Sequence, residues 1–155
     1  MSDVVVTLPL NFTWPGAPRR KGLAAWLMEG DPAGEAPSGV DYYAFYIGGA
    51  RPRIEPGERV YVVYSQRLIG YAPLIRIKMI KPSIGVPCGV GRHALIRGGG
   101  AVAVTIEEAI PGFRGWRYRW WDRSAERPIG NWPEIVAAAR ANEPLLPPIR
   151  MEASP

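Results

Sequence analysis

The stretch from Gly57 to Ala72 constrains the fold of this 155-residue chain more than any other. Apolar residues alternate along Arg59–Tyr64 with the period of two that is typical of a strand. A polar pair, Ser65-Gln66, then predicts a turn, and a second apolar run follows it. Gly70 lies inside that second run, where a glycine indicates a bulge or a close backbone approach. We therefore predict a β-hairpin at the centre of the fold.

Further short strands and two helices are expected around this hairpin. Strands are predicted over 3–10, 41–47, 93–97, 101–106 and 116–121. The second arm of the hairpin is expected to run through Pro73 to Ile80, with an edge or a bulge at the proline. The segments 93–97 and 101–106 are expected to pair across three glycines. Helices are predicted over 18–29 and 131–141, the second with Asn131 as its N-cap.

This order of elements favours a compact barrel over an alternating β-α-β sheet. The predicted fold class is α+β, mostly β, with two or three short helices in one domain over residues 1–142. At 47% apolar residues the chain has enough hydrophobic material for a packed core. Residues 143–155 are rich in proline and are expected to form an extended, partly disordered tail.

Positive charge is concentrated in one third of the chain. Residues 76–127 carry 10 basic and 4 acidic side chains, whereas residues 1–75 carry 7 of each. Such a concentration is expected of a surface that contacts phosphate. The alternative is a solvated basic face with no partner, and the excess of arginine over lysine, 16 to 3, also fits a GC-rich genome.

The segment from Phe113 to Trp121 combines arginines and large aromatic residues. In a regular strand, Trp116, Tyr118 and Trp120 would face one way and Arg117, Arg119 and Trp121 the other. One interpretation places the guanidinium groups on phosphates and an aromatic ring on a base. The other buries the aromatic rings in the core and leaves the arginines as solubilising charges.

Several classes of site are disfavoured by composition. The single Cys88 excludes an internal disulfide and zinc motifs built on cysteine pairs, and the single His93 excludes histidine-rich metal sites. We expect neither a metal nor a cofactor. The chain contains no run of about 18 apolar residues and begins without a basic signal-peptide region, so a cytoplasmic protein with no membrane contact is expected.

Several short segments resemble the PUA-like superfamily, in particular its ASCH and EVE branches. The segments are 22–30, 56–60, 68–72 and 113–116, and the resemblance spans roughly residues 20–121. They look like the first helix of the family, its turn into the hairpin, the returning strand and a late strand entry. The resemblance implies a small β-barrel that binds nucleic acid or a nucleotide fragment.

The chain departs from the family at its catalytic motif. ASCH domains carry a Gly-x-Lys and then a Glu-x-Arg after the first helix, and some members use that lysine to hydrolyse acetylated cytidine. Here Gly30 is followed by Asp31-Pro32, and no lysine occurs between Gly30 and Lys78. The next strand reads Asp41–Tyr46 and is aromatic. The departure argues against amidohydrolase activity and favours an aromatic pocket of the kind that stacks on a base.

The sequence therefore predicts a nucleic-acid-binding module, with RNA favoured over DNA, that holds a modified or flipped base. Phosphate contacts are assigned to Arg92, Arg114, Arg117 and Arg119. Stacking is assigned to Tyr43, Tyr46 or Trp116, and base-edge hydrogen bonds to Ser65 or Gln66 at the hairpin tip. The same tyrosines equally suit a protein core.

Two other functions stay open at this point. One is a hydrolase on the same fold that acts on a modified nucleoside or nucleotide, with Lys21, Glu58 or His93 as acid–base groups. The other is an interaction protein that docks a partner through the tail or the basic face. Neither the ligand nor the oligomeric state follows from the sequence.

Overall fold

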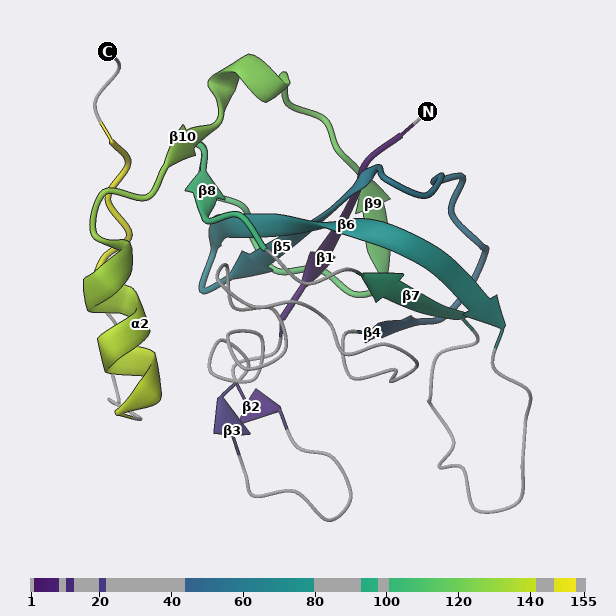
Figure 1. Ribbon diagram of the computed structural model, residues 1–155, viewed down its shortest axis with the longest axis horizontal. Helices are drawn as coiled ribbons and strands as arrows, with labels where there is room; N and C mark the ends of the chain where they lie inside the picture. Colours follow the sequence, from purple (N-terminus) through teal and green to yellow (C-terminus); the bar gives the residue numbers. More distant parts are fainter. Residues whose placement is uncertain are drawn as a thin grey trace.

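The computed structural model describes residues 2–8, 11–12, 20–21, 44–79, 93–97, 101–141 and 147–152. They form a mostly β structure around one six-stranded sheet, with the strand order β4-β7-β6-β5-β1-β9 (Figure 1). These strands are β1 (Val4–Thr7), β4 (Ala44–Ile47), β5 (Arg59–Tyr64), β6 (Arg67–Met79), β7 (His93–Arg97) and β9 (Trp116–Tyr118). Strand β1 is parallel to β5, and every other neighbouring pair is antiparallel.

Two small two-stranded sheets accompany the large one. Strand β2 (Asn11–Phe12) pairs with β3 (Arg20–Lys21), and β8 (Val104–Thr105) pairs with β10 (Arg127–Pro128). The described helices are α2 (Trp132–Arg140) and the short 3-10 turn η2 (Arg123–Ala125). Neither described helix has the length and apolar character needed to cross a membrane.

The central hairpin is confirmed. Ser65 and Gln66 form its turn with φ values of 49° and 64°, and two positive φ angles are what a two-residue hairpin turn of type I′ requires. The pairing with β5 shifts register beside Gly70: Val62 lies opposite Gly70 and Val63 opposite Leu68. Ile69 is thus the extra residue of a β-bulge, as the glycine indicated.

The long strand β6 joins the two halves of the sheet. Residues Arg67–Pro73 pair with β5, whereas Leu74–Met79 pair with β7. The change of partner coincides with a second register shift at Ile75, just after the predicted interruption at Pro73. The strand bends along its length in the view of Figure 1. Strands β4 and β7 are thereby folded over one side of the β1-β5 pair.

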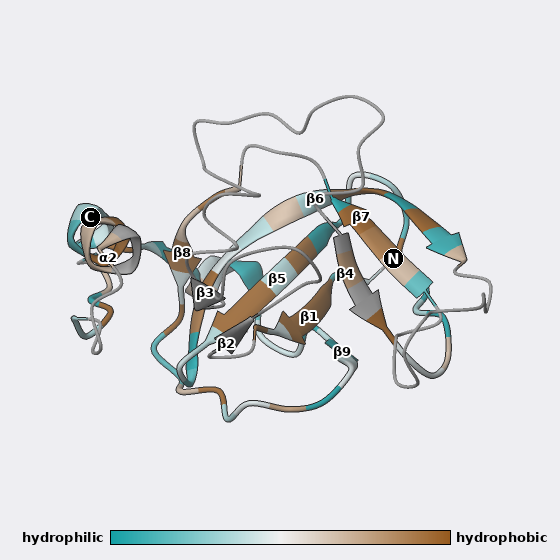
Figure 2. Cartoon of the chain, turned by 90° about the horizontal axis from the view of Figure 1, so that it is seen from below, coloured by the Kyte–Doolittle hydropathy of each residue, from teal (hydrophilic) through white to brown (hydrophobic). Residues whose placement is uncertain are grey.

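Two clusters of buried side chains lie on opposite faces of β1 and β5. The main core combines residues of both halves of the sheet, including Val6, Val62, Leu74 and Leu95. The second core contains the alternate residues of β1 and β5 and is completed by the loops before and after β9; its members are Val5, Tyr61, Val63, Leu68, Ile106, Ile110 and Trp121. Because both faces are covered, β1 is apolar from Val4 to Val6 and β5 from Val60 to Tyr64. Figure 2 shows the hydrophobic colour along the middle of these strands.

The two edges of the sheet are linked by side chains. Among the described residues no backbone ladder joins β4 to β9, so the expected barrel is not closed by strand pairing. However, the indole N–H of Trp116 on β9 donates to the carbonyl of Ala50 at 3.0 Å, and the N–H of Arg53 donates to the hydroxyl of Tyr118 at 3.0 Å. The segment that follows β4 therefore contacts the opposite edge strand.

Some predicted elements differ from the structure. Segments 93–97 and 101–106 do not pair with each other: β7 lies between β4 and β6, while β8 belongs to a separate sheet with β10. Arg20–Lys21 is a strand rather than the first turn of a helix, and 22–30 lies outside the described residues. Strand β9 ends at Tyr118, so the alternation expected over 116–121 stops there.

The segment 147–152 runs beside α2, as Figure 1 shows. Residues 147–152 are extended, as expected of the proline-rich tail, but they are held in place. Met151 forms a bridge with Ile129, and the Asn131 side chain donates to the Pro148 carbonyl at 2.7 Å and accepts from the Arg150 N–H at 2.8 Å. Asn131 does precede α2, but its side chain bonds the tail.

We expect Asn131→Ala to destabilise the protein by about 2 kcal/mol, because Asn131 is buried and the change leaves two backbone groups of the tail without their partners. Urea denaturation measures the loss, and limited proteolysis tests whether the tail becomes accessible. Glu134→Ala, in the first turn of α2, is the matched control: it removes an exposed ion pair with Arg150 and is expected to change little. Equal stability of the two variants would contradict the assigned role of Asn131.

Candidate functional site

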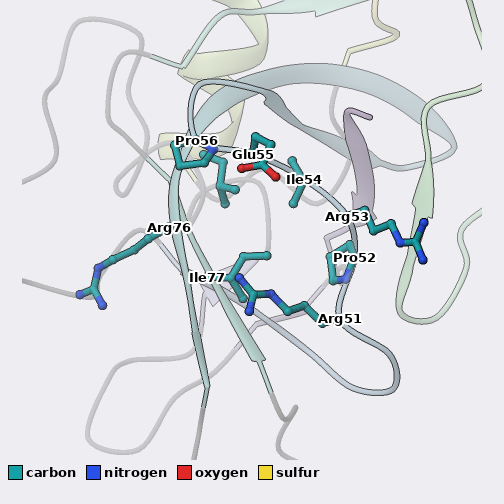
Figure 3. Close-up of a pocket in the computed structure, with 9 residues that line it drawn as sticks. Arg51, Pro52, Arg53, Ile54, Glu55, Pro56, Arg76 and Ile77 are labelled. Atoms are coloured by element: carbon teal, nitrogen blue, oxygen red, sulfur yellow. The ribbon is translucent and has the colours of Figure 1, made fainter. Parts of the chain in front are cut away.

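A cavity of about 600 Å³ lies between the segment that precedes β5 and the second half of β6 (Figure 3). This volume is within the range of about 300–1,000 Å³ that is typical of small-ligand sites. Residues 51–56 form one wall, and Leu74, Arg76 and Ile77 form the other. The cavity thus adjoins the place where β6 changes its partner from β5 to β7.

The wall made by residues 51–56 is anchored at its end by a tight turn. Pro56-Gly57 is the centre of this turn, with Gly57 at φ 90°, and the N–H of Glu58 donates to the Glu55 carbonyl at 3.0 Å. Proline followed by a glycine of positive φ is the sequence that a type II turn requires. The N–H of Gly57 also donates to the Leu74 carbonyl at 2.8 Å, which ties the two walls together.

The inside of the cavity has an apolar part and a charged part. Pro52, Ile54 and Leu74 are buried, and Ile77 is half-buried at the edge of the main core. Three charged residues are exposed along the first wall: Arg51, Arg53 and Glu55. In Figure 3 Arg51 extends toward Ile77 and the Glu55 carboxylate points into the cavity, whereas Arg53 and Arg76 point away from it at the rim.

The side chains of Arg51, Arg53 and Glu55 make no hydrogen bond or ion pair with any residue of the described part of the chain. Arg76 does have an interaction partner. Two cations and one anion at the cavity are therefore available to a ligand. The basic character of the lining suits an anionic ligand, and the carboxylate suits a group that donates hydrogen bonds.

The edge strand β9 lies next to this wall. Trp116 is half-buried against the main core, and its ring meets Tyr118 edge-on with 4.8 Å between centroids. Tyr118 is 40% exposed and accepts the hydrogen bond from the backbone of Arg53. Trp116 therefore packs on the core, as the second interpretation of the segment expected, and it also bonds the segment that carries the cavity wall. Its stacking on a base stays a prediction.

The other face of β9 carries a second aromatic group. The guanidinium of Arg117 lies 4.6 Å from the centroid of the Phe113 ring, a cation–π contact, and Trp120 packs edge-on against the same ring. Trp120 is 46% exposed and donates its indole N–H to Glu108 at 3.0 Å. It lies beside Phe113 and Trp121, because the strand has ended before it. Arg114, which follows Phe113 in the sequence, is exposed.

Arg119 is bound to a buried carboxylate. Asp3 has a side chain that is 1% exposed, and it accepts hydrogen bonds from Arg119 Nε at 2.9 Å and from the Arg123 guanidinium at 2.8 Å. The N–H of Arg59 donates to it as well. Burial alone would raise the pKa of Asp3, but these hydrogen bonds outweigh it and lower the pKa below 3.8. Arg119 thus secures the start of β1.

A second buried carboxylate joins the network. Glu126 accepts hydrogen bonds from the Tyr61 hydroxyl at 2.6 Å, the Trp121 indole at 2.9 Å and Arg59 at 3.0 Å. Burial and the hydrogen bond to Glu126 raise the pKa of Tyr61 well above its ordinary value. These groups satisfy one another, so we regard the network as structural.

The remaining residues predicted to contact nucleic acid do not meet at the cavity. Ser65 and Gln66 are exposed at the opposite end of β5, roughly 17 Å away at 3.3 Å per residue. Tyr43 and Arg92 lie outside the described residues, and Tyr46 is described only by its backbone pairing with Ala94.

The candidate acid–base groups are also dispersed. A Glu58 carboxylate oxygen accepts the Glu55 N–H at 2.9 Å and so belongs to the turn. His93 opens β7 opposite Ile47 and Met79, and its Nδ1 has no hydrogen-bond partner among the described residues. Lys21 is described only as part of β3. No three histidine, cysteine or acidic side chains in the described ranges gather as metal ligands.

The cavity residues Arg51, Arg53 and Glu55 were not predicted as site residues. The signal in the sequence was an Arg-Pro-Arg motif, which places two cations on a stiff loop directly before the central hairpin. No protein-family model, curated protein or solved structure matches this chain. The resemblance to PUA-like domains therefore stays a prediction that rests on the short segments quoted above.

Proposed function

We propose that this chain is a nucleic-acid-binding module of PUA-like type, which holds a single base of RNA in the cavity between residues 51–56 and β6. The observation that carries the proposal is a cavity of suitable size that combines apolar walls with the available guanidinium groups of Arg51 and Arg53. Proteins that recognise RNA bind unstacked bases in pockets, and their cationic side chains contact the phosphates of the RNA backbone.

The charges support a polyanion as the ligand. Arg53 and Arg76 lie at the rim and point outward, so they suit the phosphates on either side of an inserted nucleotide. Lys78 follows on the exposed side of β6. Arg117 on β9 and Trp120 just beyond its end offer a further cation and ring to an RNA strand that passes over this edge.

The contact between the sheet edges supports a barrel-like shape. In a barrel the first and last strands of the sheet meet, and here Trp116 and Tyr118 link β9 to the segment after β4. We propose that this side-chain contact takes the place of strand pairing on that side. The cavity wall would then be part of the seam between the two edges.

The test is binding of fluorescently labelled single-stranded RNA, single-stranded DNA and duplex DNA, measured by anisotropy at several salt concentrations. We expect RNA to bind most tightly, and the logarithm of the affinity to fall linearly with the logarithm of salt concentration. In Arg53→Ala the slope for RNA is expected to fall by about 0.7 for the phosphate contact removed, whereas Arg51→Ala is expected to weaken binding with little change of slope.

Arg150→Ala is the matched control. Arg150 is also an exposed arginine, but it pairs with Glu134 beside α2, at the end of the molecule opposite the 51–56 wall (Figure 1). Its removal is expected to leave the salt slope unchanged. Loss of slope in Arg150→Ala equal to that in Arg53→Ala would mean that net charge alone drives binding. Absence of binding to all three polymers at low salt would overturn the proposal.

A further inference from the structure

The cavity carries an acceptor and a donor of opposite charge on one short segment. The ionised Glu55 carboxylate can only accept hydrogen bonds, and the Arg51 guanidinium can only donate them. Both line the cavity, both are exposed, and in Figure 3 the carboxylate points inward while the guanidinium extends across to β6. A ligand that satisfies both must present hydrogen-bond donors to one side and acceptors to another.

Among the four RNA bases, guanine has this arrangement most fully. Its N1–H and N2–H2 groups form a row of donors that suits a carboxylate, and its O6 and N7 are the acceptors that arginine contacts in pairs. Cytosine and adenine each offer one amino group to a carboxylate, and uracil offers one imide N–H. The half-buried side chain of Ile77 is available to a flat face of the ring, and the largely buried Pro52 and Ile54 add to the apolar lining of the cavity.

We infer that the cavity selects guanine, with Glu55 reading the N1–H and N2–H2 donors and Arg51 reading O6 and N7. This inference rests on the proposed function, since it names the base that the same cavity would hold. It assigns to Glu55 a role in specificity that the sequence did not indicate.

The position of Glu55 is fixed by its neighbours. Its N–H donates to the Glu58 carboxylate at 2.9 Å, and its carbonyl accepts the Glu58 N–H at 3.0 Å. Both termini of the turn are therefore held, and the turn is bonded to β6 through Gly57 and Leu74. A carboxylate on so constrained a backbone can discriminate between donors and acceptors of a base.

The experiment is isothermal titration of the full chain with the 5′-monophosphates of guanosine, inosine, adenosine, cytidine and uridine. Guanosine monophosphate is expected to bind about tenfold more tightly than the inosine compound, which lacks the 2-amino group. In Glu55→Gln this preference is expected to disappear, because an amide offers only one acceptor oxygen. Glu107→Gln, an equally exposed carboxylate beyond β8, is the matched control and should keep the preference.

The outcomes separate this inference from the proposed function. Equal affinity for all five nucleotides, with RNA binding still dependent on Arg51 and Arg53, would overturn the assignment of guanine and leave the RNA-binding module intact. A guanine preference that survives in Glu55→Gln would overturn the role of Glu55. Because Glu55 is exposed, the variant is expected to fold, and its thermal midpoint serves as the check.

Discussion

Asp3→Asn is expected to lower the free energy of unfolding by about 3 kcal/mol. The Asp3 carboxylate is almost completely buried and receives bonds from two arginine side chains and one backbone N–H. An asparagine fills the same space, but it has one acceptor oxygen and carries no charge, so it leaves the partly buried Arg119 and the exposed Arg123 without their counter-ion. Removal of one partner from a buried ion pair typically costs about 3–5 kcal/mol. Urea denaturation followed by tryptophan fluorescence measures the change.

The dependence of this loss on pH provides an independent check. The folded pKa of Asp3 lies below its ordinary value of 3.8, so its contribution to stability is complete above that value. It is lost as the pH falls below 3.8 and through the folded pKa. The wild-type protein and Asp3→Asn should therefore converge in stability on acidification. A constant difference between neutral pH and pH 3 would contradict the ionic origin of the effect.

Asp122→Asn is the matched control, since it makes the same chemical change at an exposed aspartate. Asp122 accepts a hydrogen bond from the Ser124 N–H at 2.8 Å at the start of η2. Asparagine serves such a capping position as well as aspartate does, so we expect little or no change in stability. A loss as large as that of Asp3→Asn would mean that burial of the carboxylate is not what matters.

Trp116→Ala is expected to cost about 3 kcal/mol and to weaken RNA binding at the same time. The substitution removes a ring that packs on the main core and on Tyr118, and it removes the hydrogen bond to Ala50. The segment that carries Arg51 and Arg53 then loses one of its two bonds to β9. Thermal denaturation reports the first effect, and RNA anisotropy at fixed salt reports the second.

Two further variants separate the loss of stability from the loss of RNA binding. Trp116→Phe keeps much of the packing but cannot donate to Ala50, so it should weaken binding with a smaller loss of stability. Trp120→Ala removes a ring of the same type that is 46% exposed and lies beyond the end of β9, and it is expected to cost far less stability. If Trp116→Ala bound RNA as well as the wild-type protein does, the proposed seam would not position the cavity.

The parts of the fold that sequence analysis predicted are those set by neighbouring residues. The hairpin is recognisable because alternation, a polar two-residue turn and a glycine at the bulge all lie within 16 consecutive positions. The helix after Asn131 was likewise predicted from residues within the segment itself. By contrast, the expected pairing of 93–97 with 101–106 was wrong, because both segments are short apolar runs whose partners are decided by distant strands.

The site was harder to predict for a related reason. Arg119 looked like a free cation in an arginine-rich segment, yet it pairs with Asp3, 116 positions away. Arg51 and Glu55 were given no role from the sequence, because they line a cavity only where the distant strand β6 passes beside them. A sequence pattern shows which side chains carry charge, but the pairing of those charges is a property of the tertiary structure.

The central place of β1 has a consequence for synthesis of the protein. Val4 pairs with Val60 on one side and with Tyr118 on the other, so β1 is synthesised well before both of its neighbouring strands. Translation proceeds at about 5–20 residues per second, and the Val-rich strand therefore waits several seconds for its neighbours. During that interval its apolar side chains and unpaired backbone are exposed, which makes the incomplete chain prone to association through this strand.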